Sequence, residues 1–177
     1  QPMSRQKIIL SEYAGVAFSL AGAFLIGVGI PVLLFSFNAT GMALLLTGFL
    51  LTLVFTSLAF LASVKARDKA RGIGIALLLW FYFALIYDGL VMLILFNFSD
   101  YPLEKITLLL TALNPIDLAR VFIMLKMDVS ALMGVTSALY KDFFGNITGI
   151  LFTTGIMLLW AIIPLWLAVR GFKRKDI

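Results

Sequence analysis

Long apolar runs separated by short polar segments dominate the chain. Four of these runs reach membrane-spanning length, at residues 14–36, 42–64, 73–98 and 147–169. An α-helix rises about 1.5 Å per residue, so about 20 apolar residues cross the roughly 30 Å of hydrocarbon in a bilayer. The pattern therefore predicts four transmembrane helices, and the tight turn FNATG joins the first two into an antiparallel hairpin.

The segment between the last two spans, residues 99–146, is neither a clean span nor a loop. Apolar stretches at 102–113 and 129–140 lie before and after a central helical stretch at 115–127, within LTALNPIDLARVFIMLKM. A helix so apolar on most of its surface lies in the membrane interface or packs against a bundle. We expect this connector to form a helical cap that dips into the membrane.

The central stretch of the cap carries a strong helix-start signal. Asn114 is a good N-cap, Pro115 suits the first helical position, and Asp117 places a negative charge in the first turn. A helix is therefore predicted from Pro115 to about Met127. Asp117 and Arg120 lie one turn apart on it and are expected to pair.

Composition agrees with a membrane protein. Of the 177 residues, 62% are hydrophobic and 13% are charged, and the mean hydropathy is +1.08. These values predict an all-α integral membrane protein. The absence of cysteine and histidine excludes a disulfide framework, the usual Cys/His zinc site and a cysteine nucleophile within the chain.

The basic residues predict how the spans are oriented. Ten of the 14 Lys and Arg residues fall on one side of the predicted membrane, namely Arg5, Lys7, Lys65, Arg67, Lys69, Arg71, Arg170, Lys173, Arg174 and Lys175. By the positive-inside rule this side is cytoplasmic. Both ends of the chain, including the tail 170–177, are then cytoplasmic and the cap is periplasmic. The net charge of +5 needs no nucleic acid to explain it.

The first 13 residues are more polar than the span that follows them. SRQKIILSEY reads as a short amphipathic helix that leads into the first span, with Ser4, Arg5, Lys7 and Glu12 around an apolar centre. Together with the basic KARDKARG loop, this helix would form a surface for a soluble partner. Anchoring by anionic lipid explains the same charges equally well.

Small residues recur at four-residue spacing in two spans. This spacing lines them along one helix face and lets another helix approach closely. We expect both stripes to pack within one bundle rather than at a subunit seam. Their members are Gly15, Ser19, Ala23 and Gly27 in the first span, and Gly145, Gly149 and Thr153 in the last.

Asp88 lies in the middle of the third span, in LIYDGLVMLI. Because no Lys or Arg lies within any predicted span, the carboxyl group is expected to be neutral at rest and to hydrogen-bond a neighbouring helix. The candidate partners are a backbone carbonyl or Thr47, Thr56 or Thr153. Such a bond could be structural, or Asp88 could lie on a translocation path or dimer seam, since intramembrane ionisable groups are rare.

Catalytic chemistry has little support. An intramembrane aspartyl protease needs a second, facing aspartate in a GxGD context, which the spans lack. No HExxH motif or phosphate-binding loop occurs. Thioethers could hold Cu(I), although methionines in so apolar a chain more often fill packing gaps. The candidate methionines are Met92, Met124, Met127 and Met133.

The order of these segments resembles an ABC-2 type transporter permease, and most closely the permeases that serve maturation of nitrous oxide reductase. The resemblance covers most of the chain. The most specific pieces are VKARDKARGIGIALLLWF, the helix that carries Asp88, and LNPIDLARV. It implies a permease bundle with six spans in the full protein, of which a leading helix and two spans would precede this chain.

The resemblance also implies partners and a role. The permease would work as a dimer on cytoplasmic ATPase subunits, which bind the ATP and magnesium, so this chain needs no cofactor of its own. Residues 1–13 would be the coupling helix that docks on the ATPase, and the cap would receive a periplasmic accessory maturation protein. The cargo would be a sulfur species or copper for a copper–sulfur centre. A permease for another substrate, or a membrane anchor without transport, remains an alternative.

Overall fold

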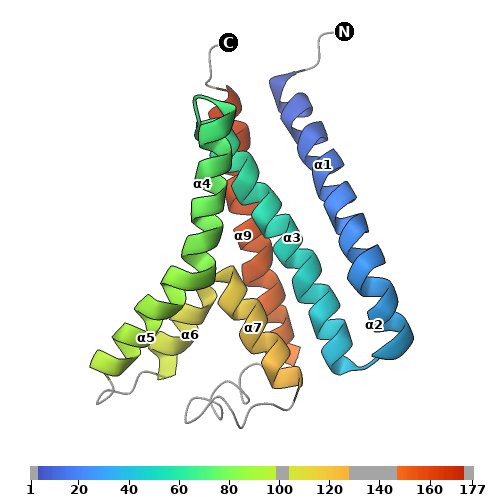
Figure 1. Ribbon diagram of the computed structural model, residues 1–177, viewed down its shortest axis with the longest axis vertical. Helices are drawn as coiled ribbons and strands as arrows, with labels where there is room; N and C mark the ends of the chain where they lie inside the picture. The colour runs from blue at the N-terminus through green and yellow to red at the C-terminus, as the bar shows by residue number, and fades with distance from the viewer. Residues whose placement is uncertain (1–3, 99–103, 128–146, 174–177) are drawn as a thin grey trace.

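The computed structural model describes residues 4–98, 104–127 and 147–173, and every regular element in these ranges is helical (Figure 1). The third stretch of the predicted cap, 129–140, and the tail beyond Lys173 lie outside the described residues. The elements are α1 (Arg5–Phe24), η1 (Leu25–Gly29), α2 (Ile30–Phe35), α3 (Ala39–Lys65), α4 (Lys69–Phe81), η2 (Tyr82–Ile86), α5 (Tyr87–Asn97), α6 (Glu104–Ala112), α7 (Pro115–Lys126) and α9 (Ile147–Lys173).

Four helical stretches are long and apolar enough to cross a membrane, as the sequence predicts. They are Gln6–Phe35, Ala39–Lys65, Lys69–Asn97 and Ile147–Lys173. The first and third are continuous through single π-helical segments, η1 and η2. The chain is thus an all-α bundle of membrane-spanning helices.

Helix α3 lies at the centre of the bundle, with α1, α4, α7 and α9 packed around it. Its buried Ala43 and Leu50 share a core cluster with Phe122 of α7 and Met157 of α9. The start of α1, the end of α9 and the α3–α4 connection lie at the same end of the molecule (Figure 1). This arrangement brings together, at one end, the basic segments that the sequence predicts to share a side.

Helices α6 and α7 form a bent pair that enters the bundle from the opposite end. Their axes differ by 113° across the short break at Leu113 and Asn114. Leu118, Ala119 and Phe122 of α7 are 0–2% exposed and pack in the core. The described part of the predicted cap, α6 and α7, therefore packs against the bundle through α7, and its placement in a membrane stays a prediction.

The predicted amphipathic segment at the N-terminus is not a separate helix. Helix α1 begins at Arg5 and runs through Tyr13 to Phe24 without a break. The Tyr13 ring meets the Phe60 ring edge-on at 5.5 Å, and the Tyr13 hydroxyl accepts a 3.0 Å hydrogen bond from Ser57. These contacts fix the start of the first span against α3, and the coupling role of residues 1–13 stays a prediction.

The two stripes of small residues differ in burial. In α9, Gly149 and Thr153 are buried along the bundle, as expected, whereas Gly145 lies outside the described residues. In the first span, Gly15, Ser19, Ala23 and Gly27 are all exposed. The prediction that this stripe packs within the bundle is therefore wrong for the described residues. The buried small residues of α1 are instead Ala17 and Ala21.

Two glycines provide a test of the packing. A Cβ at Gly41 would meet the Ser36 carbonyl oxygen across the α2–α3 turn, and would lie 2.8 Å from a Val32 methyl group. Gly22 in α1 has open space around it. We expect Gly41→Ala to lower the free energy of unfolding by about 1–3 kcal/mol. Gly22→Ala should raise it by up to about 1 kcal/mol, because alanine is the better helix former.

Thermal unfolding of the two variants in detergent measures this difference. Equal stability of Gly41→Ala and the parent protein would show that the α2–α3 turn is looser than described.

Candidate functional site

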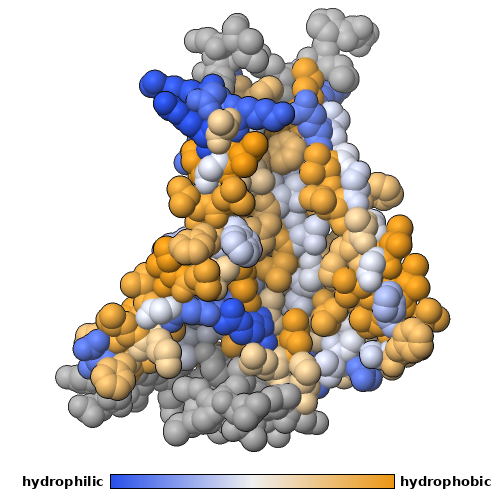
Figure 2. Space-filling view, in the orientation of Figure 1, coloured by the Kyte–Doolittle hydropathy of each residue, from blue (hydrophilic) through white to orange (hydrophobic). Residues whose placement is uncertain are grey.

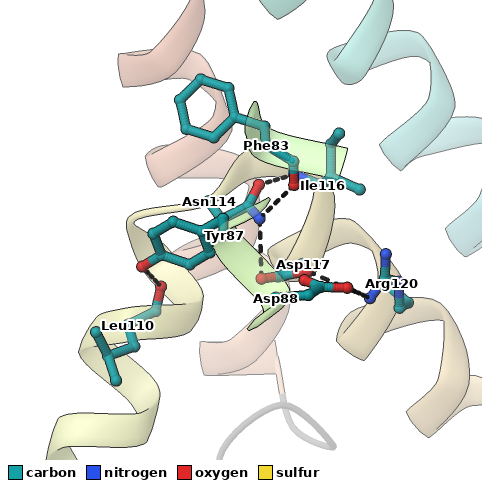
Figure 3. A network of polar contacts seen from close by, with 8 residues as sticks. All are labelled: Phe83, Tyr87, Asp88, Leu110, Asn114, Ile116, Asp117 and Arg120. Carbon is teal, nitrogen blue, oxygen red and sulfur yellow. Dashed lines mark hydrogen bonds and ion pairs between the residues drawn. The ribbon is translucent and has the colours of Figure 1, made fainter. Parts of the chain in front are cut away.

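A network of polar side chains joins the third span to the α6–α7 pair inside the bundle (Figure 3). At its centre is Asn114, which is 0% exposed. Its Oδ1 accepts from the backbone N–H of Ile116 at 3.0 Å, which caps α7. Its Nδ2 donates to the Phe83 carbonyl and to Asp117 Oδ2, each at 2.9 Å. All the polar hydrogens and the oxygen of this amide are therefore used, as burial requires.

The π-helical segment η2 makes the Phe83 carbonyl available. In an α-helix the backbone N–H of Tyr87 would bond this carbonyl, four residues back. Here the Tyr87 N–H donates instead to the Tyr82 carbonyl, five residues back. The Phe83 carbonyl then accepts from Asn114. The irregular turn is thus matched by a partner from another helix, as π-segments at functional sites often are.

Asp88 is paired with an arginine, which corrects the sequence prediction. Arg120 Nη1 donates to Asp88 Oδ2 at 2.6 Å. The prediction of a neutral, unpaired Asp88 failed because it considered only cations within spans, whereas α7 enters the bundle and carries Arg120 to the third span. The same Nη1 lies 3.4 Å from Asp117 Oδ1, so the predicted Asp117–Arg120 pair is confirmed.

The threonines that were candidates for Asp88 have other roles. Thr47 and Thr56 donate to carbonyls of their own helix, those of Ala43 and Thr52, at 2.7 Å each. The buried Thr153 hydroxyl has no partner among the described residues. None of the three satisfies Asp88.

The network contains more acidic than basic side chains. Two carboxylates, Asp88 and Asp117, share one guanidinium, that of Arg120. The Asp117 side chain is 14% exposed, whereas those of Asp88 and Arg120 are 37% and 42% exposed. The ion pair between α5 and α7 therefore lies at an open side of the described bundle, and Asp117 and Asn114 lie behind it.

Two further hydrogen bonds hold α6 from different directions. The Tyr87 hydroxyl donates to the Leu110 carbonyl at 2.7 Å (Figure 3). Trp160 Nε1 of α9 donates to the Ala112 carbonyl at 3.1 Å. The end of α6 and the start of α7 are thus fastened by side chains from two spans. The described side chains of this network thus tie the α6–α7 pair to the third and fourth spans.

The other predicted site residues do not join this network. Ser4, Lys7 and Glu12 are exposed at the other end of the molecule, where Arg5 begins α1. Among the methionines, Met92 is exposed on α5, Met124 and Met127 are exposed near the end of α7, and Met133 lies outside the described residues. The described ranges contain no group of three or more His, Asp or Glu residues placed to hold a metal. The copper idea stays a prediction.

Sequence reasoning identified Asp88, Asn114, Asp117 and Arg120 but not their common site. It missed Tyr87 as a hydrogen-bond donor and the carbonyl of Phe83 as an acceptor. One signal was available: an apolar connector helix that is buried must also bring its charged residues to a partner. The π-segment YFALI has no glycine or proline to mark it.

Comparison with known proteins assigns the chain to a family. Residues 1–177 match the profile of the ABC-2 family transporter proteins. The chain is similar to the "Probable ABC transporter permease protein NosY" of Pseudomonas aeruginosa, with 32% identity over 186 residues that cover 99% of this chain. It is similar to the protein of the same name from Stutzerimonas stutzeri, with 32% identity over 148 residues that cover 77% of this chain.

The chain spans 66% and 53% of the lengths of these two relatives. The match extends through the four spans and the bent α6–α7 pair that hold the polar network. The chain therefore belongs to the ABC-2 family of transporter proteins.

Proposed function

We propose that the chain is the membrane-spanning part of a permease subunit in an ATP-driven exporter. The observation that carries this proposal is the family match along residues 1–177, together with four membrane-spanning helices. The similarity to two probable ABC transporter permeases supports it. ATP and magnesium would be bound by a separate cytoplasmic ATPase, and the permease would pair with a second copy of itself.

In this proposal the basic end of the bundle faces the cytoplasm of a bacterial inner membrane. Figure 2 shows strongly hydrophilic surface at the end where the α3–α4 connection lies. Exposed residues there include Lys65, Arg67, Lys69 and Lys173. The positive-inside rule places such an end in the cytoplasm. The α6–α7 pair then opens toward the periplasm, where an accessory maturation protein would bind.

The cargo is proposed from the resemblance alone. The proposed role is to move a sulfur species or copper for assembly of the copper–sulfur centre of nitrous oxide reductase. It rests on the resemblance of the VKARDKARGIGIALLLWF and LNPIDLARV segments to permeases that serve maturation of that enzyme. Another substrate is compatible with the same fold, since a fold does not by itself specify function.

The polar network would serve the conformational change of transport. The Arg120–Asp88 pair and the Asn114–Phe83 bond join the bent α6–α7 pair to the third span. Movement of this pair would exchange these side-chain bonds, together with the packing of Phe122 in the core, without breaking backbone hydrogen bonds within the helices. Motion of one helical group against another is the usual basis of alternating access.

The coupling assignment is tested by charge reversal at the start of α1. Arg5→Glu with Lys7→Glu should abolish co-purification of an ATPase with the full-length protein, because the proposed docking helix would then repel its partner. The matched control is Arg170→Glu with Lys173→Glu, which reverses two charges at the same end on α9. Affinity purification in mild detergent, with quantification of bound ATPase, measures both.

Retention of the ATPase by the Arg5/Lys7 variant would show that residues 1–13 are not the coupling helix. Equal loss in both variants would assign the effect to the overall charge of this end instead.

A further inference from the structure

A cavity of about 490 Å³ lies between the end of α3 and the start of α4. Its wall is built of small side chains from both helices, namely Ala59, Ser63, Ala66, Gly72 and Ala76. Gly72 of α4 faces Ser63 of α3, and a Cβ at Gly72 would lie in van der Waals contact with the Ser63 Cα, at 3.4 Å. The small residues leave a recess that larger side chains would fill.

The mouth of the cavity is basic. Arg67 and Lys69 line it and are exposed. Asp68, the acidic residue between them, is already engaged by Arg71: it accepts from the Arg71 backbone N–H at 2.7 Å and lies 3.3 Å from the guanidinium Nε. Within the described ranges, no carboxylate forms an ion pair with Arg67 or Lys69. With respect to the described residues, both cations are therefore available to bind an anion.

The inner part of the cavity is lined by small and apolar residues that lie within the predicted spans. Ala59 and Ala76 lie six or seven residues inside spans that end at Lys65 and begin at Lys69. At 1.5 Å per residue this places them about 10 Å below the basic mouth. Ile73 adds further apolar lining. The cavity thus joins a cationic mouth at the interface to an apolar recess beneath it.

We propose that this cavity binds one anionic phospholipid. Arg67 and Lys69 would bind the phosphate, and part of an acyl chain would lie over Ala59, Gly72 and Ala76. A free phosphate would have no use for the apolar recess, and a soluble acidic protein could not reach it. Basic residues that merely anchor the end to the bilayer need no cavity. The inference does not depend on the transported substrate.

Binding is tested with the full-length protein in detergent, using phosphatidylglycerol as the probe and phosphatidylcholine for comparison. Native mass spectrometry counts the lipids that each variant retains. Arg67→Gln with Lys69→Gln should lower phosphatidylglycerol retention at least tenfold. Ala76→Phe should lower it similarly while leaving every charge in place, because the ring fills the recess. The control, Lys65→Gln with Lys173→Gln, removes two charges at the same end but outside the cavity, and should keep retention within twofold.

Each other outcome overturns the proposal. Equal loss in the control would assign retention to the general positive charge of this end. Full retention by Ala76→Phe, with helicity and monodispersity intact, would remove the acyl chain from the cavity. Displacement of the lipid by millimolar inorganic phosphate would identify a simple anion site. Unchanged lipid retention with loss of a co-purified ATPase in the Arg67/Lys69 variant would make the mouth a protein-docking surface.

Discussion

Replacing Arg120 by methionine is expected to destabilise the bundle more than replacing Asp88, its ion-pair partner, by asparagine. The substitution leaves Asp88 and Asp117 without the cation that they share. Breaking a fully buried ion pair in this way costs about 3–5 kcal/mol, and we expect about 2 kcal/mol here because more than a third of the Asp88 and Arg120 side chains is exposed. Thermal unfolding of the full-length protein in mild detergent measures the loss.

The charge balance of the network supplies the matched controls. Asp88→Asn leaves Asp117 to pair with Arg120, so it should cost less than about 1 kcal/mol. The double variant Arg120→Met with Asp88→Asn should regain part of the stability, because only one unpaired carboxylate remains. If Asp88→Asn is as damaging as Arg120→Met, the charges do not balance as the geometry indicates.

Loss of the Asn114 side chain is the second large effect that we expect. Asn114→Ala removes the cap of α7 and leaves the Phe83 carbonyl and one Asp117 oxygen without a donor. A lost N-cap costs about 1 kcal/mol. A buried acceptor left unsatisfied costs about 1–3 kcal/mol more. A total near 3 kcal/mol is expected from thermal unfolding.

Asn38 is a matched control for this substitution. It caps α3 through a 2.8 Å bond from the Gly41 backbone N–H. Unlike Asn114, it is exposed, and its side chain donates to no carbonyl of another helix among the described residues. Asn38→Ala should therefore cost only about 1 kcal/mol. Similar losses for the two variants would show that Asn114 acts as a cap and no more.

Much of this fold follows from the sequence because the signals are local. The spans are continuous apolar runs, and the start of α7 is marked by Asn114, Pro115 and Asp117 within four residues. Such signals depend on backbone hydrogen bonding and on the thickness of the bilayer, which act alike in any fold. The dipping cap was predictable for the same reason, since its helices are too apolar for water.

The polar network was less predictable because it depends on how far α7 enters the bundle beside the third span. Asp88 and Arg120 are 32 residues apart, and only the 113° bend between α6 and α7 brings them together. The prediction for the stripe at Gly15 and Gly27 failed for a different reason. Small residues on one helix face permit close packing but do not specify which helix packs there, and in the described structure this face is exposed. Neither outcome could be read from spacing alone.

The proposal that this chain is the membrane part of an ATP-driven transporter can be tested by purifying the full-length protein with its native partners. ATP hydrolysis by the purified sample is then assayed in lipid nanodiscs. We expect a separate ATPase to co-purify in a fixed ratio to the permease and to hydrolyse ATP in the complex. A purified protein that carries no ATPase and hydrolyses no ATP would contradict it, and would favour a membrane anchor in which the Asp88–Arg120 pair is purely structural.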